Sequence, residues 1–269
     1  MKLNLFQIDA FTDQLFGGNP AAVCPLEHWL EDKVLQNIAI ENNLAETAFF
    51  VPLSETHFHL RWFTPEIEMD LCGHATLAAA FVVFEEQGCQ HDSITFETQS
   101  GVLTVSKNNG YLKLDFPSRP PQKSELPKEI IAGLNIQPKE VWKARDYLLV
   151  YENEEQIKNL APNVAIFNQI NIDPGGIIVT SEGQSETIDF VSRFFTPQAS
   201  IFEDPVTGSA HCTLIPFWAK RLNKTELHAL QLSERRGELL CKLNNDRVEI
   251  KGKAVKYLQG IIEVNDTSS

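Results

Sequence analysis

Short apolar stretches rich in aromatic and β-branched residues recur along the chain, separated by polar turns. Such stretches predict β-strands. In the first half they cover residues 3–8, 47–51, 58–63, 93–97, 103–107 and 111–116. In the second half they cover residues 177–180, 187–194, 239–243 and 247–251. Asn109-Gly110 separates two of them and predicts a type I′ hairpin turn, and Asn245-Asp246 holds the corresponding place in the second half.

Three segments have helical rather than strand patterns. Residues 74–86 and 209–220 begin with positions that are apolar on nearly every side, which is typical of a buried helix. Residues 30–42 are amphipathic, and we expect them to cover the face of a sheet. Pro216 falls inside the second buried segment, where it should kink the helix or displace its hydrogen bonds.

An internal repeat relates the two halves of the chain. Arg61-Trp-Phe-Thr-Pro65 recurs as Arg193-Phe-Phe-Thr-Pro197, 132 residues later, whereas Gly73 recurs as Gly208, 135 residues later. Two copies are too few for a solenoid and fit two similar domains. We expect these domains to be residues 1–118 and 127–269, joined by the Pro-rich segment 117–127. In an alternative arrangement the last strand packs back on the first domain.

Composition and charge narrow the classes of partner. The 269 residues are 43% hydrophobic and 22% charged, as in ordinary globular proteins. The net charge is −13 and no run of Lys or Arg exceeds two, so the chain lacks the basic surface that nucleic acid requires. The longest uncharged apolar stretch, residues 75–84, is about half of a membrane span. We expect neither nucleic acid nor membrane as a partner.

Cysteine usage and the first residues bear on the compartment. The chain has 5 Cys, an odd number, and no Cys-x-x-Cys pair. This pattern predicts reduced thiols in a cytoplasmic protein. Residues 1–13 carry one Lys and no apolar core, so we expect no secretory signal there.

The starts of the two buried helices are the first candidate for a functional site. A helix N-terminus presents unpaired N–H groups and a partial positive charge. Gly73 and Gly208 would let a ligand approach the backbone at these starts. Because the repeat relates them, we expect both to face one cleft and to bind an anion. The alternative is two ordinary helix starts with Gly and Ser as caps.

Three ionisable side chains lie close to these starts or to a strand end. His74 and Asp204 flank the helix starts, and a histidine exchanges protons near neutral pH. Glu46 stands at the mouth of an apolar strand, where a carboxylate can act as a general acid or base. The alternatives are a hydrogen-bonded core histidine, a helix cap and a solvated glutamate. The second half has no equivalent of Glu46, which suits a catalyst that works with one base.

Several cofactor motifs are absent from the sequence. We find no phosphate-binding loop, no dinucleotide fingerprint, no H-E-x-x-H pair and no nucleophile elbow. His57 and His59 lie two apart on one strand, with a third histidine only at His74, which is a poor metal-binding pattern. We therefore expect no cofactor and no metal ion.

Six short motifs, in their order along the chain, resemble the phenazine-biosynthesis PhzF-like isomerase family, which has the diaminopimelate epimerase fold. The matching stretches are Asp9-Ala-Phe-Thr12, Gly18-Asn-Pro-Ala-Ala-Val23, Leu44-Ala-Glu-Thr47, Arg61-Trp-Phe-Thr-Pro65, Cys72-Gly-His-Ala-Thr-Leu77 and Glu203-Asp-Pro-Val-Thr-Gly-Ser-Ala210. The resemblance implies an α+β fold of two similar domains, each a curved mixed sheet wrapped around a central helix. It also implies a site between the two domains.

The resemblance also implies the reaction and its residues. It predicts cofactor-independent movement of a proton between carbons of a small cyclic or unsaturated carboxylic acid. The family's general acid/base glutamate falls on Glu46, and its histidine and aspartate fall on His74 and Asp204, which we expect to complete the catalytic set. The substrate-binding residues that we expect are Asn19, Gly73, Gly208 and Ser209. The characterised family substrate is a dihydro-hydroxyanthranilate, and members commonly form homodimers.

Two alternatives stay open at this point. The same fold hosts amino-acid racemases and epimerases with a cysteine before each helix-start glycine, but the corresponding residues here are Cys72 and Thr207. We expect the Thr207 hydroxyl to be too weak an acid, with no adjacent base, and Cys72 to be a small buried packing residue. The other alternative is a non-catalytic protein that binds a small acid.

Overall fold

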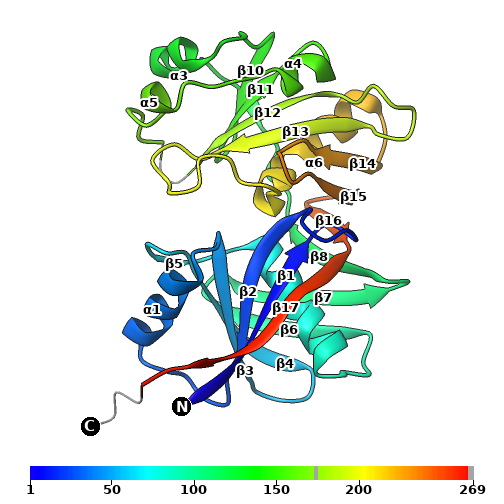
Figure 1. The fold of residues 1–269 in the computed structure, drawn as a ribbon. Coiled ribbons are helices and arrows are strands. Elements are labelled where there is room, and N and C mark those ends of the chain that lie inside the picture. The colour runs from blue at the N-terminus through cyan, green and yellow to red at the C-terminus, as the bar shows by residue number, and fades with distance from the viewer. Residues whose placement is uncertain (173–174, 266–269) are drawn as a thin grey trace. The chain divides into compact units, whose positions relative to one another are not determined.

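The computed structural model describes residues 1–172 and 175–265, and the chain divides into two compact units (Figure 1). Unit 1 contains residues 1–115 and the C-terminal segment from Lys251, and unit 2 contains residues 116–250. The chain passes between the units within two strands, β8 (Tyr111–Pro117) and β16 (Arg247–Gly252). Among the described residues, no helix has the length and apolar character that crossing a membrane requires.

These bounds differ from the expected ones at both ends of unit 2. The Pro-rich segment 117–127 belongs to unit 2 and contains the short strand β9 (Gln122–Lys123). The last strand, β17 (Ala254–Glu263), belongs to unit 1, because it pairs antiparallel with β1 (Lys2–Ala10) along the whole length of β1. The two ends of the chain therefore complete the same sheet.

Unit 1 is a mixed sheet with two helices and one π-helical turn. Its other strands are β2 (Asn19–Pro25), β3 (Glu46–Pro52), β4 (His57–Phe63), β5 (Glu68–Met69), β6 (Ser93–Thr98) and β7 (Gly101–Asn108). Its helices are α1 (Asp32–Asn42), α2 (Gly73–Phe81) and the π-helix η1 (Val82–Glu86). The predicted helix 74–86 thus changes from α to π geometry after Phe81.

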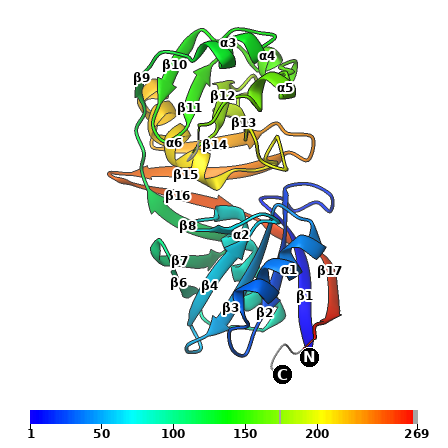
Figure 2. The same cartoon turned by 90° about the vertical axis from the view of Figure 1, so that its left-hand side faces the viewer.

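Helices α1 and α2 cover opposite faces of strand β3 (Figure 2). Side chains alternate between the two faces of a strand. Phe49 and Val51 pack with Leu35 of α1, so Ala48 and Phe50 point to the other face, which α2 contacts. Burial on both faces explains why the sequence of β3 reads as a continuous apolar run.

Unit 2 has the same kind of sheet with four helices. Its strands besides β9 are β10 (Glu140–Lys143), β11 (Tyr147–Val150), β12 (Ile177–Glu182), β13 (Phe190–Phe195), β14 (Glu226–Gln231) and β15 (Gly237–Asn244). Its helices are α3 (Lys128–Gly133), α4 (Glu154–Lys158), α5 (Val164–Phe167) and α6 (Gly208–Leu222). Helix α6 continues through Pro216, so the proline does not end it.

The two units repeat one sequence of strand pairings. In unit 1, β2 and β3 are parallel, β3 and β4 antiparallel, β4 and β6 parallel, and β6 and β7 antiparallel. In unit 2 the same series runs through β11, β12, β13, β14 and β15. The sequence repeat therefore corresponds to a repeated topology, with α2 and α6 as equivalent helices.

A bidentate ion pair precedes the central helix in each unit. The Arg61 guanidinium donates two hydrogen bonds of 2.7 Å to Glu68, and Arg193 donates bonds of 2.7 and 2.8 Å to Glu203. Each glutamate stands five residues before the first glycine of its helix. The three-residue insertion seen in the repeat therefore lies between the Thr-Pro motif and this glutamate, in residues 198–202. Each ion pair ties the segment before a helix start to a strand.

The hairpin prediction at Asn109-Gly110 is confirmed. Strands β7 and β8 pair with Asn108 opposite Tyr111, which leaves a two-residue turn. Asn109 and Gly110 both have positive φ angles, 50° and 77°, as a type I′ turn requires.

Candidate functional site

Strand β3 and helix α2 bring Glu46 and His74 together in unit 1. Glu46 is the first residue of β3, and alternation places it on the same face as Ala48 and Phe50, toward α2. His74 is the second residue of α2. The Glu46 Oε2 and His74 Nε2 atoms lie 3.0 Å apart, and their side chains are only 15% and 4% exposed.

This contact leaves hydrogen-bonding capacity on both groups. Its geometry is that of an ion pair and not of a hydrogen bond: among the described residues, neither buried atom has a hydrogen-bond partner. Buried polar atoms in native proteins are nearly always paired with protein, water or ligand. Glu46 Oε2 and His74 Nε2 therefore keep hydrogen-bonding capacity beyond their mutual ion pair.

The other edge of the His74 ring is held by two neighbours. Asn19 Nδ2 lies 3.1 Å from His74 Nδ1, and Cys72 Sγ lies 3.6 Å from the same nitrogen. Asn19 starts β2, which runs parallel to β3, and Cys72 is the N-cap of α2. Asn19, Glu46, Gly73 and His74, four of the predicted site residues, thus lie together in unit 1.

The surroundings set the charge of His74 and Cys72. Burial alone would lower the pKa of His74, but the Cys72 sulfur and the Glu46 carboxylate raise it well above its ordinary value. Burial and the nearby Glu46 carboxylate raise the pKa of the Cys72 thiol to about 11, although His74 opposes this. The raised pKa keeps the Cys72 thiol neutral near neutral pH, and the raised pKa of His74 favours its ion pair with Glu46. The expected burial of Cys72 is confirmed.

Glu46, Cys72 and His74 also form a group of potential metal ligands. Their donor atoms lie within 4.8 Å of one another. Cys, His and carboxylate are the ligand types of zinc, but zinc requires the thiolate. The absence of a resident metal stays a prediction.

Asp204 contacts the N-cap of α6 in unit 2. The Thr207 hydroxyl donates a hydrogen bond of 2.5 Å to Asp204 Oδ2. Gln231 of β14 accepts from the Thr207 backbone N–H at 2.9 Å and donates to the Asp204 carbonyl at 2.8 Å. The expectation that Thr207 has no adjacent base is therefore wrong. The motif Glu203–Thr207 curls back, so that a carboxylate three residues earlier in the chain meets the hydroxyl.

Ser209, the second residue of α6, contacts an arginine that the sequence analysis did not identify. Arg145 Nη2 donates a hydrogen bond of 3.0 Å to Ser209 Oγ. The same guanidinium bonds Asp146, whose side chain is fully buried. Arg145-Asp146 immediately precedes the apolar strand β11, as Glu46 opens the apolar strand β3. The argument that singled out Glu46 could have found this pair too.

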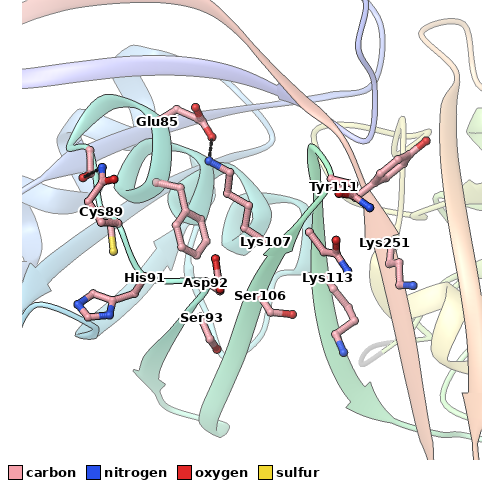
Figure 3. A pocket seen from close by; sticks show the side chains of 15 residues that line it. Glu85, Cys89, His91, Asp92, Ser93, Ser106, Lys107, Tyr111, Lys113 and Lys251 are labelled. Atoms are coloured by element: carbon pink, nitrogen blue, oxygen red, sulfur yellow. Dashed lines mark hydrogen bonds and ion pairs between the residues drawn. The ribbon is translucent and has the colours of Figure 1, made fainter.

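A pocket of about 940 Å³ in unit 1 has a different set of lining residues (Figure 3). It is lined by polar and charged side chains, among them Glu85, Lys107, Lys113 and Lys251. Lys107 Nζ pairs with Glu85 Oε1 at 2.5 Å. None of the predicted site residues lines this pocket, so it does not belong to the candidate site.

The chain belongs to the family of phenazine biosynthesis-like proteins, whose model matches residues 8–260. It is 46% identical to an uncharacterized isomerase of Pseudomonas aeruginosa, over 98% of this chain and 100% of that protein. It is 48% identical to an uncharacterized isomerase of Halalkalibacterium halodurans, over 96% and 98%.

A solved structure has the same fold over the whole chain. The phenazine biosynthesis protein PhzF family structure from Enterococcus faecalis is 45% identical and has a TM-score of 0.93. The match covers 98% of this chain and 100% of that one. The resemblance drawn from the six motifs and the expected α+β fold are both confirmed.

Proposed function

We propose that the protein is a cofactor-independent isomerase that moves a proton between two carbons of a small cyclic or unsaturated carboxylic acid. The observation that carries this proposal is the buried contact of 3.0 Å between Glu46 and His74. Membership of a family whose curated relatives are named isomerases supports the reaction class.

In this proposal Glu46 is the general acid/base. Its carboxylate takes a proton from one carbon of the substrate and returns it to another carbon, so that no redox partner is needed. His74, held by Asn19 on one side, fixes the carboxylate on the other and stabilises negative charge that develops on the substrate. Burial of both groups excludes water from the proton transfer.

The residues of unit 2 enter the proposal as substrate-binding groups. The ground for proposing Gly73 and Gly208, the first residues of α2 and α6, as donors of backbone N–H groups to the substrate is the resemblance to the family. Ser209 would add a hydroxyl, and Asp204, fixed by Thr207, would accept a hydrogen bond from the substrate. A homodimer in the cytoplasm also remains a prediction.

A racemase with two catalytic thiols is a weaker candidate. Such a mechanism needs a thiolate on each side of the substrate carbon. The pKa of about 11 keeps Cys72 protonated, and the partner position is Thr207. The Asp204 carboxylate accepts a hydrogen bond from the Thr207 hydroxyl and could act on it as a base, but a hydroxyl does not replace the second thiol of such a mechanism.

Incorporation of deuterium from D₂O tests the proposal directly. We expect the purified protein to exchange a carbon-bound proton of at least one member of a panel of small cyclic or unsaturated acids. The exchange should be unaffected by a chelator such as EDTA. A panel member that binds and shows no exchange under any condition would support a binding protein instead, whereas exchange that EDTA abolishes would point to a metal.

A further inference from the structure

We propose that the pocket of unit 1 shown in Figure 3 binds the phosphate group of a small polar molecule, and that Ser106, Lys113 and Lys251 hold this group. The site goes beyond the proposed function, because none of the residues that line the pocket takes part in the proposed reaction. The three residues form one row of side chains across three paired strands.

Strand registers align the three residues of this row. Ser106 of β7 pairs directly with Lys113 of β8. Strand β8 also pairs with β16, and the Ser118 N–H donates to the Asp246 carbonyl at 2.8 Å, where β8 ends and β16 begins. Because β8 runs toward this bond and β16 runs away from it, the two strands are antiparallel. Counting five residues along each strand from the bond places Lys113 opposite Lys251.

A contact further along the two strands agrees with this register. The Lys253 Nζ atom lies 5.3 Å from the centre of the Tyr111 ring. Tyr111 and Lys253 each lie two residues beyond the lysine pair, so the same register places them opposite each other. Lys113 and Lys251 therefore project from neighbouring positions on one face of the sheet, with their Cβ atoms about 4.5–5.5 Å apart.

Two lysines in directly opposite positions repel each other. Like charges that face each other on adjacent strands destabilise a sheet. Lys113 and Lys251 are both half-buried, so solvent ions screen their repulsion less than on an open surface. In a chain with 36 acidic and 23 basic residues, such a pair does not follow from composition. A bound anion would relieve the repulsion.

The row offers hydrogen-bond donors as well as charge. The Lys251 ammonium makes no hydrogen bond or ion pair with the residues that the structure describes, and the Ser106 hydroxyl likewise makes none with them. An ammonium group carries three N–H donors, so Lys113 keeps donors for a ligand beside any bond to the protein. The three side chains can thus donate to one anion from different directions.

A third lysine of the pocket is already paired. Lys107 Nζ lies 2.5 Å from Glu85 Oε1. In Figure 3 the Lys107 side chain reaches toward Glu85, whereas those of Lys113 and Lys251 extend in other directions. The other acidic residue of the pocket is Asp92, which is exposed. The lining therefore keeps a net positive charge, which comes from Lys113 and Lys251.

Two further acidic residues lie next to the lysine pair along the chain. Asp115 and Glu249 are two residues from Lys113 and Lys251, on the same faces of their strands, and neither lines the pocket. They reduce the positive potential of the pair. A singly charged anion should therefore bind poorly, and the site favours a ligand group with close to two negative charges.

The kind of cation favours phosphate over carboxylate. Among the described residues that line the pocket, none is an arginine, whose planar fork matches the two oxygens of a carboxylate. Lysine is instead a point charge with rotatable donors, and it is a common phosphate ligand. A phosphate monoester carries a charge of about −1.5 to −2 near neutral pH and offers three oxygens to donors from different sides.

The size and lining of the pocket indicate what carries the phosphate. The cavity of about 940 Å³ is larger than inorganic phosphate requires and is typical of a small-molecule site. Its lining also includes the amides of Gln90, Asn108 and Asn109 and the hydroxyl of Ser93. Amides and hydroxyls both donate and accept hydrogen bonds. They suit a hydroxylated carrier such as a sugar better than an apolar one.

An NMR titration of the isotope-labelled, full-length protein tests the inference. The probes are inorganic phosphate, glucose 6-phosphate and glucose, each added at constant ionic strength. We expect saturable shifts of the Ser106, Lys113 and Lys251 amide resonances with both phosphates, and none with glucose. Glucose 6-phosphate should bind more tightly than inorganic phosphate, because its sugar meets the amides of the pocket.

Variants of the row measure what each residue contributes. Lys251→Met should weaken binding of glucose 6-phosphate about tenfold or more, because it removes a charge-assisted hydrogen bond. Ser106→Ala should weaken it about fivefold. The matched control is Lys33→Met, at an exposed lysine of α1, which should bind within about twofold of wild type. If Lys251→Met does not fold, Lys251→Gln replaces it.

Three results would overturn the phosphate site. The first is the absence of saturable shifts in wild type at constant ionic strength. The second is a set of shifts centred on the starts of α2 or α6 instead of the pocket. The third is equal affinity of wild type and the Lys251 variant. None of them bears on deuterium exchange, and exchange that survives in Glu46→Gln would overturn the proposed function while leaving the phosphate site intact.

Discussion

Glu46 Oε2 and His74 Nε2 lie 3.0 Å apart, one on the first residue of a strand and the other on the second residue of the helix that covers it. Neither atom has a hydrogen-bond partner among the described residues. The arrangement joins the carboxylate that we propose as the general acid/base to a histidine of raised pKa, both of them buried, and the predictions about the reaction follow from it.

The charge of His74 should depend on Glu46. Because the carboxylate raises the pKa of His74, Glu46→Gln should lower that pKa. The stabilisation from charged His74 is fully present below its unfolded pKa of about 6.5 and is lost as pH rises through the higher folded value. Titration of the imidazole resonances by NMR measures both pKa values.

Stability measurements provide the control for that titration. The free energy of unfolding of wild type, followed by urea denaturation, should fall as pH rises above about 6.5, and this fall should be smaller in Glu46→Gln. His91→Gln removes an exposed histidine and should leave the His74 titration unchanged. A His74 pKa that is equal in wild type and Glu46→Gln would show that the ion pair has no energetic weight.

Cys72 should be dispensable for the reaction. Its thiol is protonated near neutral pH, because burial raises its pKa to about 11. We expect Cys72→Ser to retain activity within about tenfold, which allows ~1 kcal/mol for altered packing. The rate of deuterium incorporation from D₂O measures this. An inactive Cys72→Ser together with an active Glu46→Gln would replace the isomerase with a thiol mechanism.

The Arg193–Glu203 ion pair should stabilise unit 2. Both side chains are largely buried, at 14% and 24% exposure, and the contact is bidentate. We expect Glu203→Gln to lower the free energy of unfolding by about 1–3 kcal/mol. Glu226→Gln, which breaks the exposed pair with Lys242, should cost less than about 1 kcal/mol. Equal losses in urea denaturation would show that Arg193–Glu203 is only a surface contact.

His211 should make the protein sensitive to acid. Burial lowers the pKa of His211 to about 4, although a backbone bond to the Thr207 carbonyl opposes this. Between about pH 6.5 and 4 the unfolded chain binds a proton that the folded chain does not. The free energy of unfolding should therefore decrease as the pH is lowered through this range, by up to about 3 kcal/mol. His211→Asn keeps a donor for Thr207 and should flatten this part of the profile. Identical pH profiles would contradict the prediction.

Strands and helices buried on one or both faces were predictable from local patterns. The apolar runs around Phe49 and Phe194 correspond to β3 and β13, and the all-apolar segment after Gly73 corresponds to α2. The residues of β17 were not predicted as a strand, although one alternative placed the last strand on the first domain, because its side chains are at least partly exposed and its sequence shows no apolar alternation. What holds it is backbone pairing with β1, a partner at the other end of the chain.

The candidate site was predictable where its residues stand in recognisable motifs. Glu46 and His74 stand in motifs with recognisable neighbours, and the structure brings them together. Arg145 stands in no such motif, and only its place at the mouth of the apolar strand β11 could have singled it out. The contact between Thr207 and Asp204 depends on how the segment before α6 curls, which no periodicity reveals.

The central claim is that Glu46 is the general acid/base, and the rate of deuterium exchange in Glu46→Gln tests it most directly. The amide keeps the shape of the side chain and cannot accept the proton, so the rate should fall about 10²–10⁴-fold. Glu55→Gln, at an exposed carboxylate, is the matched control and should exchange like wild type. Circular dichroism should show that both variants are folded. A folded Glu46→Gln that exchanges at the wild-type rate would contradict the account.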